Sequence, residues 1–110
     1  MGITMTLKRE RGSNKVNGLC KLAIVDDMTI YAIDDLKNAL NEEIDLYDRF
    51  DLNLSAVEEI DSAGIQLLLA LRTELISKNK ELKISSQSEV VTKIMESYDV
   101  IDIFNIGENA

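Results

Sequence analysis

The sequence predicts a small α/β domain, with a mixed sheet of four to five strands and helices mainly on one face. Short segments alternate apolar and polar residues as half-buried strands do, whereas longer segments repeat apolar residues at helical spacing. After two N-terminal strands, helical and strand-like segments alternate along the chain. Because the 110 residues include no proline-rich or glycine-rich linker and no internal repeat, we expect residues 1–110 to form a single domain.

Two strands are predicted near the N-terminus. Ile3, Met5 and Leu7 alternate with polar residues, and a second strand-like run extends from about Leu19 to Val25. Four basic residues cluster around Gly12-Ser13-Asn14, namely Lys8, Arg9, Arg11 and Lys15. We interpret this cluster as an exposed loop or hairpin tip rather than as a nucleic-acid-binding arm.

A helix is predicted after a turn at residues 26–29. Its apolar residues recur at helical spacing and are Ile33, Leu36, Ala39, Leu40 and Ile44. Asp34 and Asp35 lie near its start, where carboxylates interact favourably with the helix dipole. A third strand is predicted after this helix, because apolar and polar residues alternate over residues 50–55.

A second helix is predicted from Ser62 or Ala63 to about Lys78. The five residues of its main apolar stripe are Ile65, Leu68, Leu69, Leu75 and Ile76. Leu67 and Leu71 widen this apolar arc, so we expect the helix to pack on the sheet over much of its girth.

The C-terminal part of the chain predicts one more strand and one more helix. Leu82 and Ile84 mark a short fourth strand, and Ser88 can cap a third helix. The residues of that helix expected to point inward are Val91, Ile94 and Met95. Residues 100–106 are apolar enough to return to the core, but their pattern fits either a strand or a short helix.

The charge balance argues against nucleic-acid binding. The chain has 20 acidic and 12 basic residues and therefore a formal net charge of −8, whereas nucleic-acid binding normally requires basic residues that neutralise phosphates. No apolar run approaches the roughly 20 residues of a spanning helix, so no direct membrane insertion is expected. The first residues lack the features of a signal peptide, and we expect a cytoplasmic protein.

The absence of histidine restricts the chemistry that the chain can perform. It removes the Ser-His-Asp triad, histidine phosphorelay and most zinc sites. Cys20 is the single cysteine, and its strand-like surroundings favour a buried structural thiol in a reducing compartment. Because no nucleophile–base pair and no glycine-rich phosphate loop are evident, we expect neither an enzyme nor a bound cofactor.

The segment Ile60-Asp61-Ser62-Ala63-Gly64-Ile65 places a hydroxyl where a strand-like segment gives way to a helix. Ser62 could serve as an N-cap, which contributes about 1 kcal/mol. Alternatively, it could accept a phosphate, which would meet the free amides and positive dipole of a helix N-terminus. Asp61 could be either the true cap or a recognition group. We interpret the acidic run Glu58, Glu59 and Asp61 as a solvated loop rather than a metal site.

With its neighbours, this segment resembles the STAS domain, the fold of bacterial anti-sigma factor antagonists. Residues 52–65 are similar to the family pattern of an aliphatic strand, Ser-x-Val, an aliphatic residue, Asp-Ser-Ser/Ala-Gly and a leucine-rich helix. Residues 28–37 are similar to the segment that enters the family's first helix. Residues 91–96 followed by Ile103-Phe104 are similar to its closing pattern. The resemblance covers about residues 17–106.

The resemblance implies a partner-switching regulator that is phosphorylated at Ser62. In this family the unphosphorylated antagonist binds an anti-sigma factor that is itself a serine kinase of the GHKL type. Phosphorylation releases the antagonist, and a PP2C-type phosphatase resets it. The residues that the resemblance assigns to partner binding are Thr29, Glu59, Asp61, Ser62, Ala63, Gly64 and Gln66. The strand at residues 3–7 could be an exposed edge through which two copies pair.

The sequence departs from the family pattern at three places. Asn53 stands where many relatives have aspartate, Ala63 replaces the second serine of the commonest regulated form, and Asp26-Asp27 replaces a Gly-Glu pair. Asp-Ser/Thr-Ala-Gly also occurs in STAS subunits of a phospholipid-transport ABC system. The alternative function is therefore a non-enzymatic accessory subunit of such a complex.

Overall fold

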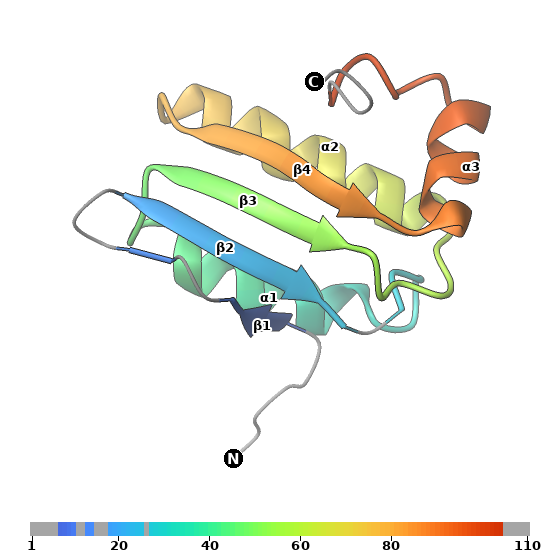
Figure 1. Cartoon of the computed structure of the whole chain (residues 1–110), viewed down its shortest axis with the longest axis horizontal. Coiled ribbons are helices and arrows are strands. Elements are labelled where there is room, and N and C mark those ends of the chain that lie inside the picture. The colour runs from blue at the N-terminus through green and yellow to red at the C-terminus, as the bar shows by residue number, and fades with distance from the viewer. Residues whose placement is uncertain (1–6, 11–12, 15–17, 26, 105–110) are drawn as a thin grey trace.

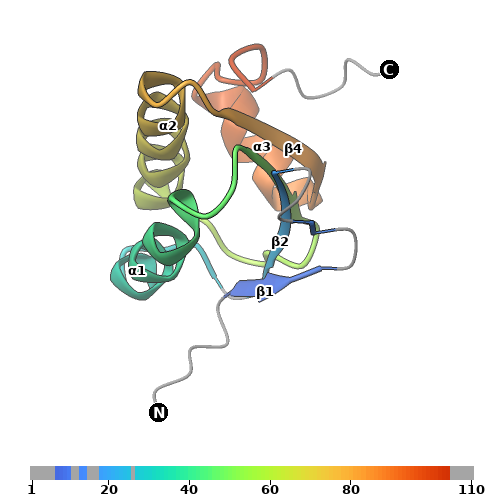
Figure 2. The ribbon, with the colours of Figure 1, turned by 90° about the vertical axis from the view of Figure 1, so that its left-hand side faces the viewer.

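The chain folds as an α/β domain in which one sheet carries helices on one face (Figures 1 and 2). The computed structural model describes residues 7–10, 13–14, 18–25 and 27–104. In chain order the elements are β1 (Leu7–Arg9), β2 (Leu19–Ile24), α1 (Ile33–Ile44), β3 (Arg49–Leu54), α2 (Ser62–Ser77), β4 (Glu81–Gln87) and α3 (Glu89–Ser97).

The sheet is mixed, as the sequence predicts. Its strand order is β1-β2-β3-β4; β1 is antiparallel to β2, whereas β2, β3 and β4 are parallel. Leu22, Leu52 and Ile84 are aligned across the three parallel strands. Parallel neighbours require crossover connections, and α1 and α2 provide them on the same face of the sheet (Figure 2).

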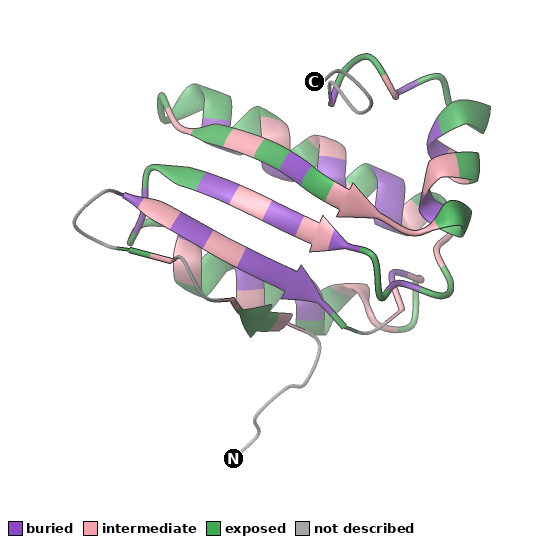
Figure 3. Cartoon of the chain, in the orientation of Figure 1, coloured by how far each residue is buried: buried purple, intermediate pink, exposed green. Residues whose placement is uncertain are grey.

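The core lies between this face and the two crossover helices (Figure 3). Alternate residues of β2 and β3 point into it: Cys20, Leu22, Ile24, Phe50, Leu52 and Leu54 are buried. From the helices the buried apolar residues are Leu36, Leu40 and Ile44 of α1, and Ile65, Leu68, Leu71 and Leu75 of α2. This alternation confirms the strand predictions, and the buried residues of α1 confirm the predicted stripe of the first helix.

The apolar stripe predicted for α2 is wrong at one end. Ile76 is 52% exposed, whereas Leu71, which was assigned only to the margin of the arc, is buried. The apolar residues of α2 cover so wide an arc that periodicity alone does not select the buried face. Spacings of three and four residues from Ile65 through Leu68 and Leu71 to Leu75 define the line that packs on the sheet.

Ser88 caps α3 as predicted and also ties that helix to the loop after β3. Its Oγ accepts a hydrogen bond from the Val91 amide at 3.4 Å and donates one to the Val57 carbonyl at 2.7 Å. Val91 and Met95 are fully buried, and Ile94 is partly buried. α3 therefore lies at the end of the sheet where β4 ends (Figure 1).

Two predicted boundaries differ from the structure at the ends of the sheet. Arg9 belongs to β1 rather than to the loop or hairpin tip, because pairing with Leu22 of β2 extends the strand beyond Leu7 and Lys8. β4 is not short: it spans seven residues and extends beyond Ile84 to Gln87, with a register shift opposite Leu52 and Asn53.

The terminal predictions fall only partly on the described residues. Of the strand predicted at residues 3–7, only Leu7 is described, and of the basic cluster Arg11 and Lys15 lie outside the described residues. At the other end, residues 101–104 form turns rather than a strand. Val100 and Phe104 are buried, so this part of the tail returns to the core; residues 105 and 106 lie outside the described residues.

A polar cluster joins β1 to α1. Arg9 Nη2 donates to Glu43 Oε1 at 2.6 Å, and its guanidinium lies 5.8 Å from the centroid of the Tyr47 ring. The Cys20 thiol donates to the same Glu43 oxygen at 3.9 Å. Cys20 is fully buried, and this burial, together with the Glu43 carboxylate, raises the pKa of its thiol to about 11. The thiol is therefore neutral at physiological pH.

We expect Cys20 to make the free energy of unfolding decrease as the pH rises above 9, so that the fold becomes less stable. The thiol of the unfolded chain ionises near the ordinary cysteine value of 9.0, whereas the folded thiol stays neutral until about 11. The stabilisation is therefore fully present below pH 9 and is lost as the pH rises through about 11, a change of about 2–3 kcal/mol. Urea unfolding at a series of pH values measures it. Cys20→Ala is the matched control, and an identical slope in both proteins would contradict the assignment.

Candidate functional site

The candidate site lies where the loops after β2 and β3 meet at the carboxyl ends of the parallel strands (Figure 1). The Met28 amide donates to the Glu59 carbonyl at 2.8 Å, and the Asp61 amide donates to the Met28 carbonyl at 3.3 Å. Met28 and Ile60 thus form an isolated parallel bridge outside the sheet. This bridge holds residues 28–32, which precede α1, against the start of α2.

Asp61 is the N-cap of α2. Its backbone is extended, with φ −126° and ψ −169°, and its Oδ1 accepts a hydrogen bond from the Ala63 amide at 2.9 Å. Its other carboxylate oxygen, Oδ2, accepts a hydrogen bond from the Ile30 amide at 3.1 Å. The sequence left open whether Asp61 was a cap or a recognition group. The geometry shows that one carboxylate both caps α2 and fixes the neighbouring turn.

Ser62 is the first residue of α2, and its side chain is exposed. The cap is therefore supplied by Asp61, so the interpretation of Ser62 as the N-cap is wrong. The expectation that a phosphate would meet free first-turn amides also needs correction. Ala63 donates to the Asp61 side chain, and the Gly64 and Ile65 amides donate to the Asp61 carbonyl at 3.0 and 3.3 Å. A phosphate on Ser62 would experience the helix dipole but would not enter a preformed amide nest.

Gly64 allows the two loops to approach this closely. A Cβ atom at this position would lie 2.5 Å from the Met28 carbonyl oxygen and 2.7 Å from Cγ1 of Ile60. Both distances are shorter than real carbon contacts, and the nearer atom belongs to the backbone. The glycine is therefore required by the bridge between Met28 and Ile60.

The other predicted partner-binding residues lie around the junction between residues 28–32 and the start of α2. Glu59 is exposed on the loop, Ala63 is half-buried in the first turn, and Thr29 is half-buried next to the Ile30 amide that Asp61 holds. Gln66 is exposed four residues after Ser62, a spacing that makes the two side chains neighbours on the helix surface.

Two residues at this junction were not singled out from the sequence. Ile30 and Tyr31 lie in the turn before α1, and their exposed fractions are 63% and 96%. Their sequence signal was weak: they immediately precede the helical apolar repeat that begins at Ile33, so they could be read as its extension. The structure instead places both outside the core.

The junction is strongly acidic. Segments 25–36 and 55–66 contain seven carboxylates and no lysine or arginine. Among the described members of this set, Asp34, Asp35, Glu58 and Glu59 are exposed, whereas Asp27 is half-buried and Asp61 is half-buried in its capping role. Within the described part of the chain, no three Asp, Glu or Cys side chains converge as a metal site. The arrangement presents negative charge and an accessible hydroxyl at the surface of the domain.

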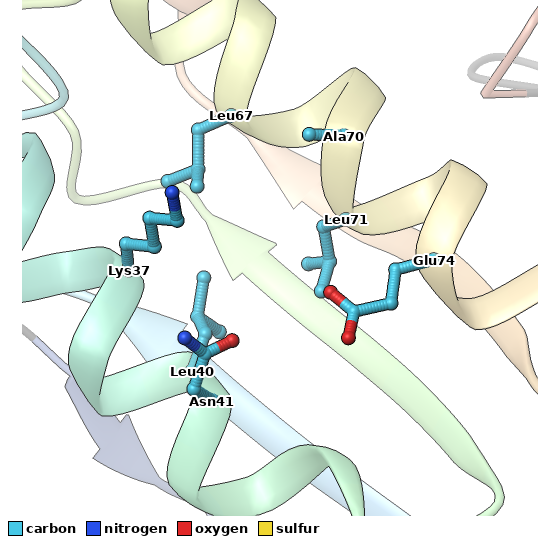
Figure 4. A pocket seen from close by; sticks show the side chains of 7 residues that line it. All are labelled: Lys37, Leu40, Asn41, Leu67, Ala70, Leu71 and Glu74. Carbon is cyan, nitrogen blue, oxygen red and sulfur yellow. The ribbon is translucent and has the colours of Figure 1, made fainter.

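A separate shallow groove lies between α1 and α2 (Figure 4). Its lining residues are Lys37, Leu40, Asn41, Leu67, Ala70, Leu71 and Glu74. Leu40 and Leu71 are buried at its floor, and the lining carries one ammonium and one carboxylate group. This lining combines apolar side chains with ordinary surface charges and includes no thiol or hydroxyl nucleophile.

Comparisons with known proteins agree on the fold. A family model described as "Mlab, STAS domain" matches residues 14–105. No curated protein matches the chain. Among solved structures, it is similar to the anti-sigma factor antagonist SpoIIAA in its unphosphorylated form, with TM-score 0.68 and 14% identity, covering 86% of this chain and 81% of that one. It is also similar to SpoIIAA, the Bacillus cell fate determinant, in the phosphorylated form, with TM-score 0.67 and 13% identity, covering 89% and 86%.

None of the helices in the described part of the chain has both the length and the apolarity needed to cross a bilayer.

We expect Gly64→Ala to destabilise the fold, because the new methyl group would overlap the Met28 carbonyl oxygen. Overpacking of this kind typically costs about 1–3 kcal/mol. Urea unfolding would measure the loss, with Gln66→Ala on the exposed face of the same helix as the control. An unfolding free energy equal to that of the wild type would show that the junction can relax without cost.

We expect Asp61 variants to release the two amides in steps. Asp61→Ala removes both acceptors and the cap, at a cost of about 1 kcal/mol. Asp61→Asn keeps one oxygen acceptor and should protect only one of the Ala63 and Ile30 amides. Hydrogen exchange followed by NMR would measure protection at both. If both amides remained protected in Asp61→Ala, the bridging role of this carboxylate would be wrong.

Proposed function

As the chain belongs to the STAS domain family, we propose that it is an anti-sigma factor antagonist in bacterial partner switching. When unphosphorylated it binds an anti-sigma factor that is a serine kinase of the GHKL type. Phosphorylation at Ser62 releases it, and a PP2C-type phosphatase restores the binding form. It acts as a non-enzymatic, cytoplasmic, single-domain binding protein over residues 1–110.

The observation that carries this proposal is that Asp61 caps α2, whereas Ser62 does not and is exposed. Asp61 accepts the hydrogen bonds that cap α2, and the Ser62 side chain is exposed beside it. A kinase can therefore modify the hydroxyl without removing a bond on which the helix depends. The similarity to SpoIIAA, solved in an unphosphorylated and a phosphorylated form, supports the same use of the fold.

Charge explains how one phosphate would change binding. Phosphorylation adds about −1.5 to −2 charges at pH 7. The added group would lie beside Asp61 and Glu59, and it would also carry its hydration shell into the contact with the partner. A change of about 1.4 kcal/mol alters an equilibrium tenfold, so repulsion and desolvation at a few contacts suffice. The switch therefore acts at the interface rather than by unfolding the domain.

A second candidate is a non-enzymatic STAS accessory subunit of a phospholipid-transport ABC complex. The matching family model is described as "Mlab, STAS domain" rather than as an anti-sigma factor antagonist, and this description supports the alternative. In that case the same end of α2 would bind an ABC ATPase. Affinity purification with the wild-type chain separates the two, because a GHKL-type kinase supports the first and an ABC ATPase the second.

We expect the cognate kinase to phosphorylate Ser62 in the presence of ATP. Ser62→Ala should abolish phosphate incorporation but retain kinase binding, whereas Ser62→Asp should weaken binding about tenfold or more through its added charge. Mass spectrometry locates the phosphate, and calorimetry measures the affinity. Ser97→Ala, which removes an exposed serine of α3, is the matched control.

Recovery of unmodified protein, under conditions in which the kinase phosphorylates another substrate, would contradict the proposal. Phosphate on Ser97 rather than Ser62 would contradict the assignment of the site.

A further inference from the structure

The turn before α1, which is hydrogen-bonded to the Asp61 carboxylate next to Ser62, exposes two large apolar side chains. Tyr31 is 96% exposed and Ile30 is 63% exposed, the two highest values among the large hydrophobic residues that the structure describes. Ile76 follows at 52%, and Leu46 and Tyr98 are each 48% exposed, so Tyr31 in particular stands apart from the other large hydrophobic residues. Single exposed apolar residues are normal on protein surfaces. An adjacent pair at the candidate site, however, forms an apolar surface that a partner could bury.

This turn is held in place by its backbone. The Ala32 amide donates to the Thr29 carbonyl at 2.9 Å, and the Ile30 amide donates to Asp61 Oδ2 at 3.1 Å. The bridge between Met28 and Ile60 fixes its base. A side chain presented on a fixed backbone loses less conformational entropy on binding than one on a loose loop. Ile30 and Tyr31 are thus preorganised for contact.

We propose that Ile30 and Tyr31, together called the apolar tip, are the anchor by which the kinase partner recognises this chain. The inference rests on the proposed function and adds the chemistry of the partner's receiving surface. That surface has an apolar pocket for the tip and a basic rim. Tyrosine is among the residues that contribute most to binding when they fill such pockets, and it buries about 150–250 Å² of surface.

The charges around the tip determine which occupant it fits. Exposed Asp34 and Asp35 follow the tip, and exposed Glu58 and Glu59 lie on the neighbouring loop. The two segments that carry these residues have no lysine or arginine. An anionic lipid surface or a second copy of this acidic face would be repelled. A protein with a basic rim is attracted, and electrostatic complementarity would also speed its association.

Asp61 makes the tip and the phosphorylation site a single unit. The same carboxylate that holds the Ile30 amide caps the helix that begins with Ser62. A partner that seats the tip therefore also places its surface over Ser62. The tip supplies affinity and Ser62 supplies control, so loss of the tip weakens binding of both the phosphorylated and the unphosphorylated forms.

The test is calorimetric binding of the purified chain to its cognate kinase. Tyr31→Ala should weaken binding about tenfold or more, as expected for a central anchor. Tyr31→Phe should bind nearly as the wild type does. Tyr98→Ala, which removes the exposed tyrosine at the end of α3, is the matched control and should leave affinity unchanged. Because Tyr31 is 96% exposed, the thermal stability of both Tyr31 variants should match that of the wild type.

Salt dependence and a vesicle control complete the design. Raising the salt concentration should weaken kinase binding, since opposite charges on the two rims are screened. If Tyr31→Ala bound the kinase with the affinity of the wild type, the role of the apolar tip would be overturned but the proposed function would remain intact. Failure of the wild type to bind the kinase would overturn both. Tyr31-dependent binding to phosphatidylglycerol vesicles would overturn the tip's assignment to a protein partner.

Discussion

The approach of the Met28 backbone to the first turn of α2 is the constraint on which the rest of the site depends. Gly64 permits it, because any side chain there would collide with the Met28 carbonyl. Once the two backbones are in contact, the Asp61 carboxylate lies between two amides from different segments and accepts a hydrogen bond from each. Ser62 is then left exposed beside a turn whose position is already fixed. A small residue at one place thus determines where the hydroxyl, the acids and the apolar tip lie relative to one another.

The strands and most helix boundaries could be predicted because their signals are local. Alternation in β2 and β3 and the spacing of Leu36, Leu40 and Ile44 reflect burial on one face, which the sequence records directly. The Ser88 cap was predictable for the same reason. The end of β1 was harder to predict, because Arg9 follows Lys8 and does not continue the alternation of apolar and polar residues. Pairing with β2 keeps this short strand in place, as does the contact of Arg9 with Glu43 on α1, which lies far along the chain.

The site could be predicted in composition but not in geometry. Aspartate and serine are both good caps, so the sequence could not choose between Asp61 and Ser62; the extended backbone at Asp61 and the nearby Ile30 amide make the choice. Exposure of Tyr31 was equally hidden. It depends on the bridge between Met28 and Ile60, two residues whose proximity arises only when the parallel strands align.

The relative size of the charge effects indicates where a phosphate on Ser62 would exert its influence. The helix dipole would stabilise the phosphate by about 0.3–1 kcal/mol, and repulsion from the neighbouring Asp61 opposes this gain. Because the side chain is exposed and its hydroxyl does not cap the helix, these opposed terms leave the folding free energy nearly unchanged. Inside an interface, solvent no longer screens the phosphate, and an ion that is desolvated without full pairing costs several kcal/mol. The same group that the free domain tolerates is therefore expensive in the complex, which is the asymmetry that a partner switch requires.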